Sequence, residues 1–209
     1  MRHITTINLR KSKFVDSVSK NRFLIVLAVL YVFGMILGAV LLGKSSSVYS
    51  VAQTSFVGFR QIRTDKDFFG IFFSALTSFA PAVIALYLSG TSVVGVALSP
   101  LIICYCGFTY GIKAGYIYLK YALQGIAFNS LILIPCTVIA AIGYFICASR
   151  AFGFSAGLIR VIMPQKSSAE IFESFKNYCR SFTVVIIIFL ISALLDAVTA
   201  VAFFKYFSF

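Results

Sequence analysis

The sequence CGFTYGIKAG at residues 106–115, followed by GIAFNSLILIP at residues 125–135, decides the fold of this chain. In the first segment Gly107, Gly111 and Gly115 recur every four residues, so they lie on one face of a helix. Helices in a lipid bilayer gain little from the hydrophobic effect, and close contact over small residues takes its place. We therefore predict that this glycine face packs tightly in a membrane protein.

The second segment combines polar residues with a helix breaker. Asn129 and Ser130 precede Pro135 inside an otherwise apolar run. Polar side chains and proline at membrane depth are tolerated mainly where neighbouring protein satisfies the freed backbone groups. The two segments together predict a helical hairpin at the packed centre of the protein, with Asn129 and Ser130 as intramembrane polar candidates.

Composition excludes a soluble domain. Of the 209 residues, 60% are hydrophobic and 11% are charged, whereas a soluble domain has roughly 25% charged residues. A soluble fold of this length could not bury so much apolar surface. The net charge of +12 suits loops that meet anionic lipid head groups, and no recognisable nucleic-acid module accompanies it.

Five apolar segments are long enough to cross a bilayer, which takes about 20 residues. We predict an all-α polytopic membrane protein, a single domain over residues 1–209 with amphipathic interfacial helices. The uncharged stretch 68–112 is too long for one crossing, and its turn is expected near Gly90. The predicted spans are about 23–42, 68–88, 93–112, 125–147 and 181–204.

The segments between the spans are polar and mostly basic. Residues 1–22 form a basic cytoplasmic leader to an uncleaved first span, in which Gly34 and Gly38 make a second candidate helix contact. Residues 43–66 form an outer loop with a short helix in the head-group plane, and we expect the charges at its end to be solvated. Residues 148–180 form a basic cytoplasmic loop with an amphipathic helix that runs into the fifth span.

The orientation follows from counting Lys and Arg. With the N-terminus in the cytoplasm, the inner segments carry six plus five, or eleven, and the outer segments carry the other seven of the 18. Positive residues favour the cytoplasmic side, so the count predicts a cytoplasmic N-terminus and an external C-terminus.

No catalytic, cofactor-binding or metal-binding residues are predicted, and we expect no enzyme activity and no cofactor. The five cysteines form no C-x-x-C pair and His3 is the only histidine, so a metal site of known spacing is lacking. Residues 153–157 match the G-x-S-x-G pattern of a nucleophilic serine. Such a serine needs a base within reach, and we attribute the match to coincidence.

Asp196 lies within the fifth predicted span. A charged group at the centre of a bilayer costs about 2.5 to 3.5 kcal/mol on insertion scales, so it usually faces protein or water. One interpretation is a polar contact to Asn129, Ser130 or Lys113, or a place in a proton or substrate path. The other is an acid near the interface that is partly hydrated from the outer side. The sequence leaves both open.

The order and spacing of these segments resemble the stage II sporulation protein M family of bacterial membrane proteins. The resemblance covers nearly the whole chain, and the following segments carry it: 21–23 (NRF), 34–39 (GMILGA), 107–111 (GFTYG), 129–135 (NSLILIP), 157–160 (GLIR) and 191–197 (ISALLDA).

The resemblance implies a non-enzymatic protein of the bacterial cytoplasmic membrane. In spore formers such proteins help drive engulfment by holding cell-wall-degrading enzymes at the septal membrane. It implies the lipid bilayer and extracytoplasmic cell-wall hydrolases as partners. The alternative is a small permease or transporter subunit, which would have a water-accessible cavity lined by Asp196, Asn129 and the proline breaks. Transporters often contain two similar halves, and no clear repeat is visible here, which favours the scaffold.

Overall fold

The computed structural model describes residues 22–65, 67–162 and 168–204, and these residues form helices without any strand. The predicted all-α class is thus confirmed for this part of the chain, whereas the basic leader over residues 1–21 lies outside it. The helices are α2 (Arg22–Lys44), α3 (Ser46–Asp65), α4 (Phe68–Gly90), α5 (Gly95–Phe128), the π-helix η1 (Asn129–Leu133), α6 (Ile134–Ile162) and α7 (Ser168–Phe203).

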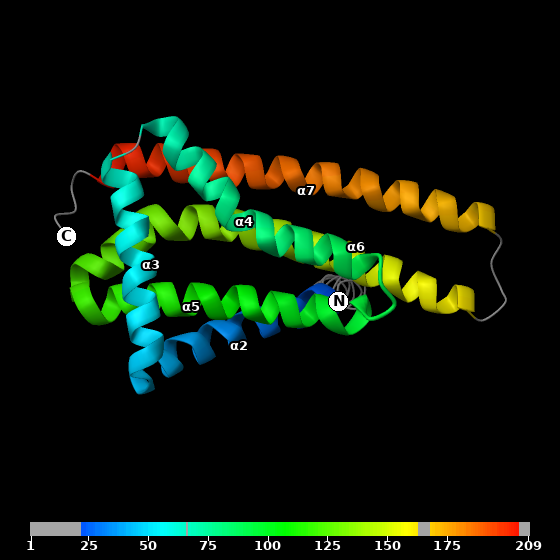
Figure 1. Ribbon diagram of the computed structural model, residues 1–209, viewed down its shortest axis with the longest axis horizontal. Coiled ribbons are helices and arrows are strands. Elements are labelled where there is room, and N and C mark those ends of the chain that lie inside the picture. Colours follow the sequence, from blue (N-terminus) through cyan, green and yellow to red (C-terminus); the bar gives the residue numbers. More distant parts are fainter. Residues whose placement is uncertain (1–21, 66, 163–167, 205–209) are drawn as a thin grey trace, which may run out of the picture.

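The helices α2, α4, α5, α6 and α7 run lengthwise along the molecule, and α3 crosses them at one end (Figure 1). Within the described residues four helical segments are long and apolar enough to cross a membrane: Arg22–Lys44, Phe68–Gly90, Gly95–Ile159 and Glu173–Phe203. The outward face of α2 is apolar and exposed, with Val29 62% and Ile36 57% exposed. Such a large exposed apolar face suits contact with lipid rather than water.

The third of these segments is interrupted by a reversal of the chain at Ala122. This residue has φ 46° and ψ −120°, a conformation outside the helical region. The chain then runs back along itself through η1 and α6 (Figure 1). Residues 113–121, which follow the end of the third predicted span at residue 112, instead continue α5 as a helix.

The helices α2 and α5 pack against each other through their glycines. An added Cβ would lie 2.1 to 2.3 Å from a carbonyl oxygen of the facing helix at Gly34, Gly38, Gly107 and Gly111. Real Cβ atoms do not approach so closely, so only glycine permits this spacing. Gly115 is less crowded, with its nearest neighbour, Leu42 Cδ2, 3.2 Å from an added Cβ.

Several helices extend beyond the predicted spans. The helix α6 continues to Ile162 through residues expected to lie in a cytoplasmic loop, and α7 has 36 residues, or about 54 Å of helix. The hydrocarbon core is only about 30 Å thick, so α7 is longer than one crossing requires. The π-helix precedes Pro135, which has no N–H for a helical hydrogen bond.

Candidate functional site

A cavity of about 660 Å³ lies between α4 and α5, with α6 as its floor. Tyr31 of α2, Arg63 of α3 and Asp196 of α7 also line it, so every long helix and the crossing helix contribute to its wall. Its rim includes exposed side chains on both sides: Leu101 and Tyr105 of α5 are 63% and 64% exposed, and Ser78 and Pro81 of α4 are exposed opposite them. The cavity therefore opens sideways between α4 and α5, on the surface that carries the apolar side chains.

A buried ion pair stands at one end of this cavity. The guanidinium of Arg63 donates a hydrogen bond to the Asp196 carboxylate, and the two side chains are only 5% and 6% exposed. The guanidinium carbon also lies 3.3 Å from the centre of the Phe59 ring, and the thiol of Cys136 donates to the other carboxylate oxygen at 3.7 Å. The pair thus ties α3 to α7 across 133 residues of sequence.

The face of α3 that bears Arg63 explains how this cation reaches the interior. Ala52, Phe56, Phe59 and Arg63 follow one another at helical spacing, and Ala52 and Phe56 are buried. The Phe56 ring packs against Tyr116 of α5 at 5.5 Å between centroids. Our expectation that the charges of this segment are solvated is wrong for Arg63, because the helix turns it toward the bundle. The helical spacing that puts Arg63 on the same face as Phe56 and Phe59 was the feature of the sequence that could have predicted its burial.

The electrostatics of Arg63 reflect this burial. Desolvation lowers the pKa of the guanidinium from its ordinary value, because burial penalises the charged form, and the neighbouring Asp196 carboxylate opposes that change. The Nε atom of Arg63 is also buried, and among the described residues it has no hydrogen-bond partner. Breaking a buried pair of this kind is expensive, because the remaining charge has no water to solvate it.

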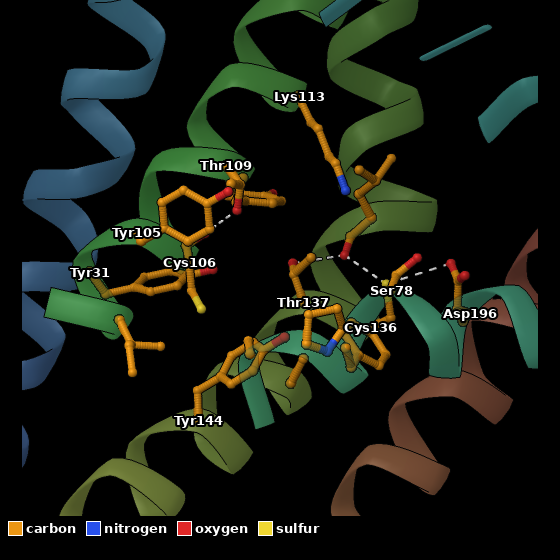
Figure 2. Close-up of a pocket in the computed structure, with 18 of the residues that line it drawn as sticks. Tyr31, Ser78, Tyr105, Cys106, Thr109, Lys113, Cys136, Thr137, Tyr144 and Asp196 are labelled. Atoms are coloured by element: carbon orange, nitrogen blue, oxygen red, sulfur yellow. Dashed lines mark hydrogen bonds between the residues drawn. The ribbon is translucent and has the colours of Figure 1, made fainter. Parts of the chain in front are cut away.

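A second cation, Lys113 of α5, lines the same cavity (Figure 2). Within the described ranges no hydrogen bond or ion pair reaches its ammonium group. The charges of Arg63 and Asp196 cancel, so the positive charge of Lys113 gives the charged groups of the cavity wall a net charge of +1. Figure 2 shows the side chain directed inward, from α5 toward the helix that carries Cys136 and Thr137.

The predicted partners of Asp196 do not bind it in the structure. Asn129 is buried and donates through its amide to the Tyr118 hydroxyl, while the Tyr110 hydroxyl donates to the Asn129 side-chain oxygen at 3.2 Å. Asn129 thus stabilises the α5–η1 hairpin rather than Asp196, and Ser130 is exposed on η1. Asp196 pairs with Arg63 instead, because α3 packs against α2, α4 and α5 and its last turn brings the Arg63 side chain to α7.

The serine of the G-x-S-x-G match has a structural role. Ser155 is fully buried, and its hydroxyl donates to the backbone carbonyls of Ser92 at 2.6 Å and Val93 at 3.2 Å. The hydroxyl therefore ties α6 to the turn between α4 and α5. The single histidine, His3, lies outside the described residues.

The fold and the cavity define a class of protein: an all-helical bundle with membrane-length apolar helices and a charged interior cavity. The described ranges contain no group of three or more His, Cys, Asp or Glu that could hold a metal ion, and all five cysteines are free. No protein-family model matches the chain, and neither a curated protein nor a solved structure shows significant similarity to it.

Proposed function

We propose that this chain is a multi-pass protein of the bacterial cytoplasmic membrane that crosses the bilayer five times with its N-terminus in the cytoplasm. The reversal at Ala122 supports five crossings, because it divides the 65-residue segment Gly95–Ile159 into two antiparallel passes. The distribution of Lys and Arg supports the orientation. Reporter fusions after residues 66 and 165 test it: the first is expected outside and the second inside. Both reporters on one side would refute the proposal.

Within that topology we propose a scaffold that presents α3 on the outer face of the membrane. The observation that carries this role is the buried Arg63–Asp196 pair, which fixes α3 across the end of the bundle. A helix needed only as a connection gains nothing from so costly a contact. The opposite face of α3 is exposed and mostly polar, with Ser50 and Gln53 beside the exposed Val57 available to a partner. By the resemblance to the sporulation family, that partner is a cell-wall hydrolase.

Site-specific photocrosslinking tests the scaffold. A photoreactive residue at Gln53 is expected to capture a peptidoglycan hydrolase in native membranes, whereas the same residue at the exposed, lipid-facing Val29 of α2 is not. Asp196→Asn should weaken the capture at Gln53, because it removes the carboxylate that holds α3 in place. Equal capture at the two positions, or capture at Gln53 that Asp196→Asn leaves unchanged, would refute the role of α3.

A permease or transporter subunit is the second candidate, and the cavity itself favours it. Asp196 and Pro81 line this cavity as that alternative requires, while Asn129 is not among the lining residues. Thr109→Cys, in a variant whose native cysteines are replaced, places a single thiol in the wall. A permease predicts that membrane-impermeant thiol reagents reach it from both sides of the bilayer. Access from neither side, or from one side alone, would count against transport.

A further inference from the structure

The unpaired ammonium of Lys113 is the starting point. Lys113 lies nine residues before the reversal at Ala122, or about 13 Å along the helix. Lysines near the ends of membrane helices usually extend their side chains to the interface. This one points into the cavity (Figure 2), and the described residues provide it with no anionic partner of its own. The Lys113 side chain is exposed to this open cavity, and an uncompensated cation beside apolar surface favours the binding of an anion.

Hydrogen-bond donors are also available in the cavity. Tyr31, Tyr105 and Tyr144 line it from α2, α5 and α6, and among the described residues none of their hydroxyls has a hydrogen-bond partner. The hydroxyls of Ser78, Thr109 and Thr137 donate to backbone carbonyls, as Thr109 does to the Cys106 carbonyl at 2.9 Å. The three phenols can therefore donate to oxygen atoms of a bound molecule, while the nearby threonines cannot without giving up a bond.

The shape of the cavity indicates where such a molecule comes from. Its volume of about 660 Å³ falls within the roughly 300 to 1,000 Å³ of small-molecule sites. Its open side lies between α4 and α5, where Pro81 and Leu101 are exposed apolar rim residues. An apolar chain can pass through this opening into the surrounding lipid, while a polar head stays inside.

We propose that the cavity binds an anionic amphiphile drawn from the membrane. Its phosphate or carboxylate head lies against the Lys113 ammonium, and oxygen atoms next to the head accept hydrogen bonds from the phenols. Its apolar chain leaves between α4 and α5. The Arg63–Asp196 pair closes the end of the cavity and, being neutral as a pair, leaves Lys113 to select the charge of the head. This inference concerns the interior of the bundle and does not depend on the scaffold role of α3.

Native mass spectrometry of the purified full chain tests the proposal. The chain is titrated in detergent with dioleoylphosphatidylglycerol, with dioleoylphosphatidylcholine and with inorganic phosphate. We expect the anionic lipid to bind at least tenfold more tightly than the zwitterionic one. Lys113→Gln should abolish that preference, because a charged hydrogen bond contributes about tenfold or more in affinity. Lys113→Arg should keep it, as should Lys120→Gln, because Lys120 does not line the cavity and already donates to the Tyr116 hydroxyl.

A second pair of variants tests the place of entry without changing charge. Ser78 is exposed at the cavity rim on α4, and Thr77 beside it is exposed but does not line the cavity. Ser78→Trp should obstruct the opening and reduce binding of the anionic lipid about tenfold, while Thr77→Trp should leave it unchanged. Gel filtration and thermal unfolding of each variant establish that it is folded.

The same measurements can overturn the proposal. Equal affinity of the natural chain for both lipids would show that the cavity does not select an anionic head group. If the Lys113→Gln variant unfolds at the same temperature as the natural chain and still prefers the anionic lipid, the lipid lies elsewhere. Binding of inorganic phosphate that requires Lys113, with no binding of phosphatidylglycerol, would identify a water-soluble anion and exclude a ligand from the membrane.

Discussion

Removing one partner of the Arg63–Asp196 pair should destabilise the protein far more than removing both. In Asp196→Asn the Arg63 guanidinium, whose side chain is 5% exposed, keeps its charge without a carboxylate beside it. Breaking a buried ion pair in this way costs about 3 to 5 kcal/mol. Arg63→Met should cost a similar amount, because it leaves the Asp196 carboxylate with only the Cys136 thiol as a donor among its described contacts.

The double variant Arg63→Met, Asp196→Leu should lose less stability than either single variant. Replacing both charges by apolar groups of similar volume removes the desolvation cost together with the attraction, and such replacements are often neutral. Reversible unfolding in mixed micelles measures the free energy of each variant, and the four proteins form a double-mutant cycle. Asp67→Asn, at an exposed carboxylate before α4, is the matched control and should change stability by less than about 1 kcal/mol. Losses in the double variant that equal the sum of the single losses would refute the reasoning.

Three further substitutions test other contacts of the bundle. Gly38→Ala should cost about 1 to 3 kcal/mol, because its Cβ would lie 2.3 Å from the Phe108 carbonyl oxygen. Ser155→Ala should cost about 1 kcal/mol by removing the donor to the turn between α4 and α5. Tyr178→Phe should cost a similar amount, because the Tyr178 hydroxyl donates to the Tyr87 carbonyl at 2.9 Å. Thermal and chemical unfolding in detergent measure all three.

Each of these variants has a matched control within the chain. Gly43→Ala, in the same helix but with nothing within 4 Å of an added Cβ, should stabilise α2 by about 0.5 to 1 kcal/mol. Ser130→Ala removes the hydroxyl of an exposed serine and Tyr49→Phe that of an exposed tyrosine, so both should leave the free energy of unfolding nearly unchanged. A Gly38 variant as stable as the Gly43 variant would show that α2 and α5 can separate at no cost.

Hydropathy predicted most of the helical architecture but not the helix ends. The uncharged segment from residue 68 predicted α4 to within two residues of its observed end at Gly90. The reversal at Ala122 lies within residues 113–124, between the third and fourth predicted spans, but its exact position was not predicted, because neither glycine nor proline marks Ala122 and alanine has no preference for positive φ. Helical periodicity also cannot distinguish a span from its extension into the head groups, so α6 and α7 proved longer than predicted.

The candidate site was only partly visible in the sequence. Asp196 stood out because it is an acid within an apolar run, and that property alone required a partner. Its partner could not be chosen, because Arg63 lies 133 residues away in a segment of mixed charge. The inward direction of Lys113 depends on how α5 is rotated against α4 and α6. Rotation of this kind follows from packing, which no local pattern encodes.

The link between α3 and α7 also has a consequence for how the protein is made. Ribosomes deliver Arg63 to the membrane long before Asp196, since the chain is synthesised from its N-terminus. Until the last helix inserts, the early helices therefore hold an arginine without its carboxylate. A polypeptide truncated before Asp196 would keep Arg63 without that partner. Insertion of the C-terminal helix is therefore what supplies the carboxylate that neutralises Arg63.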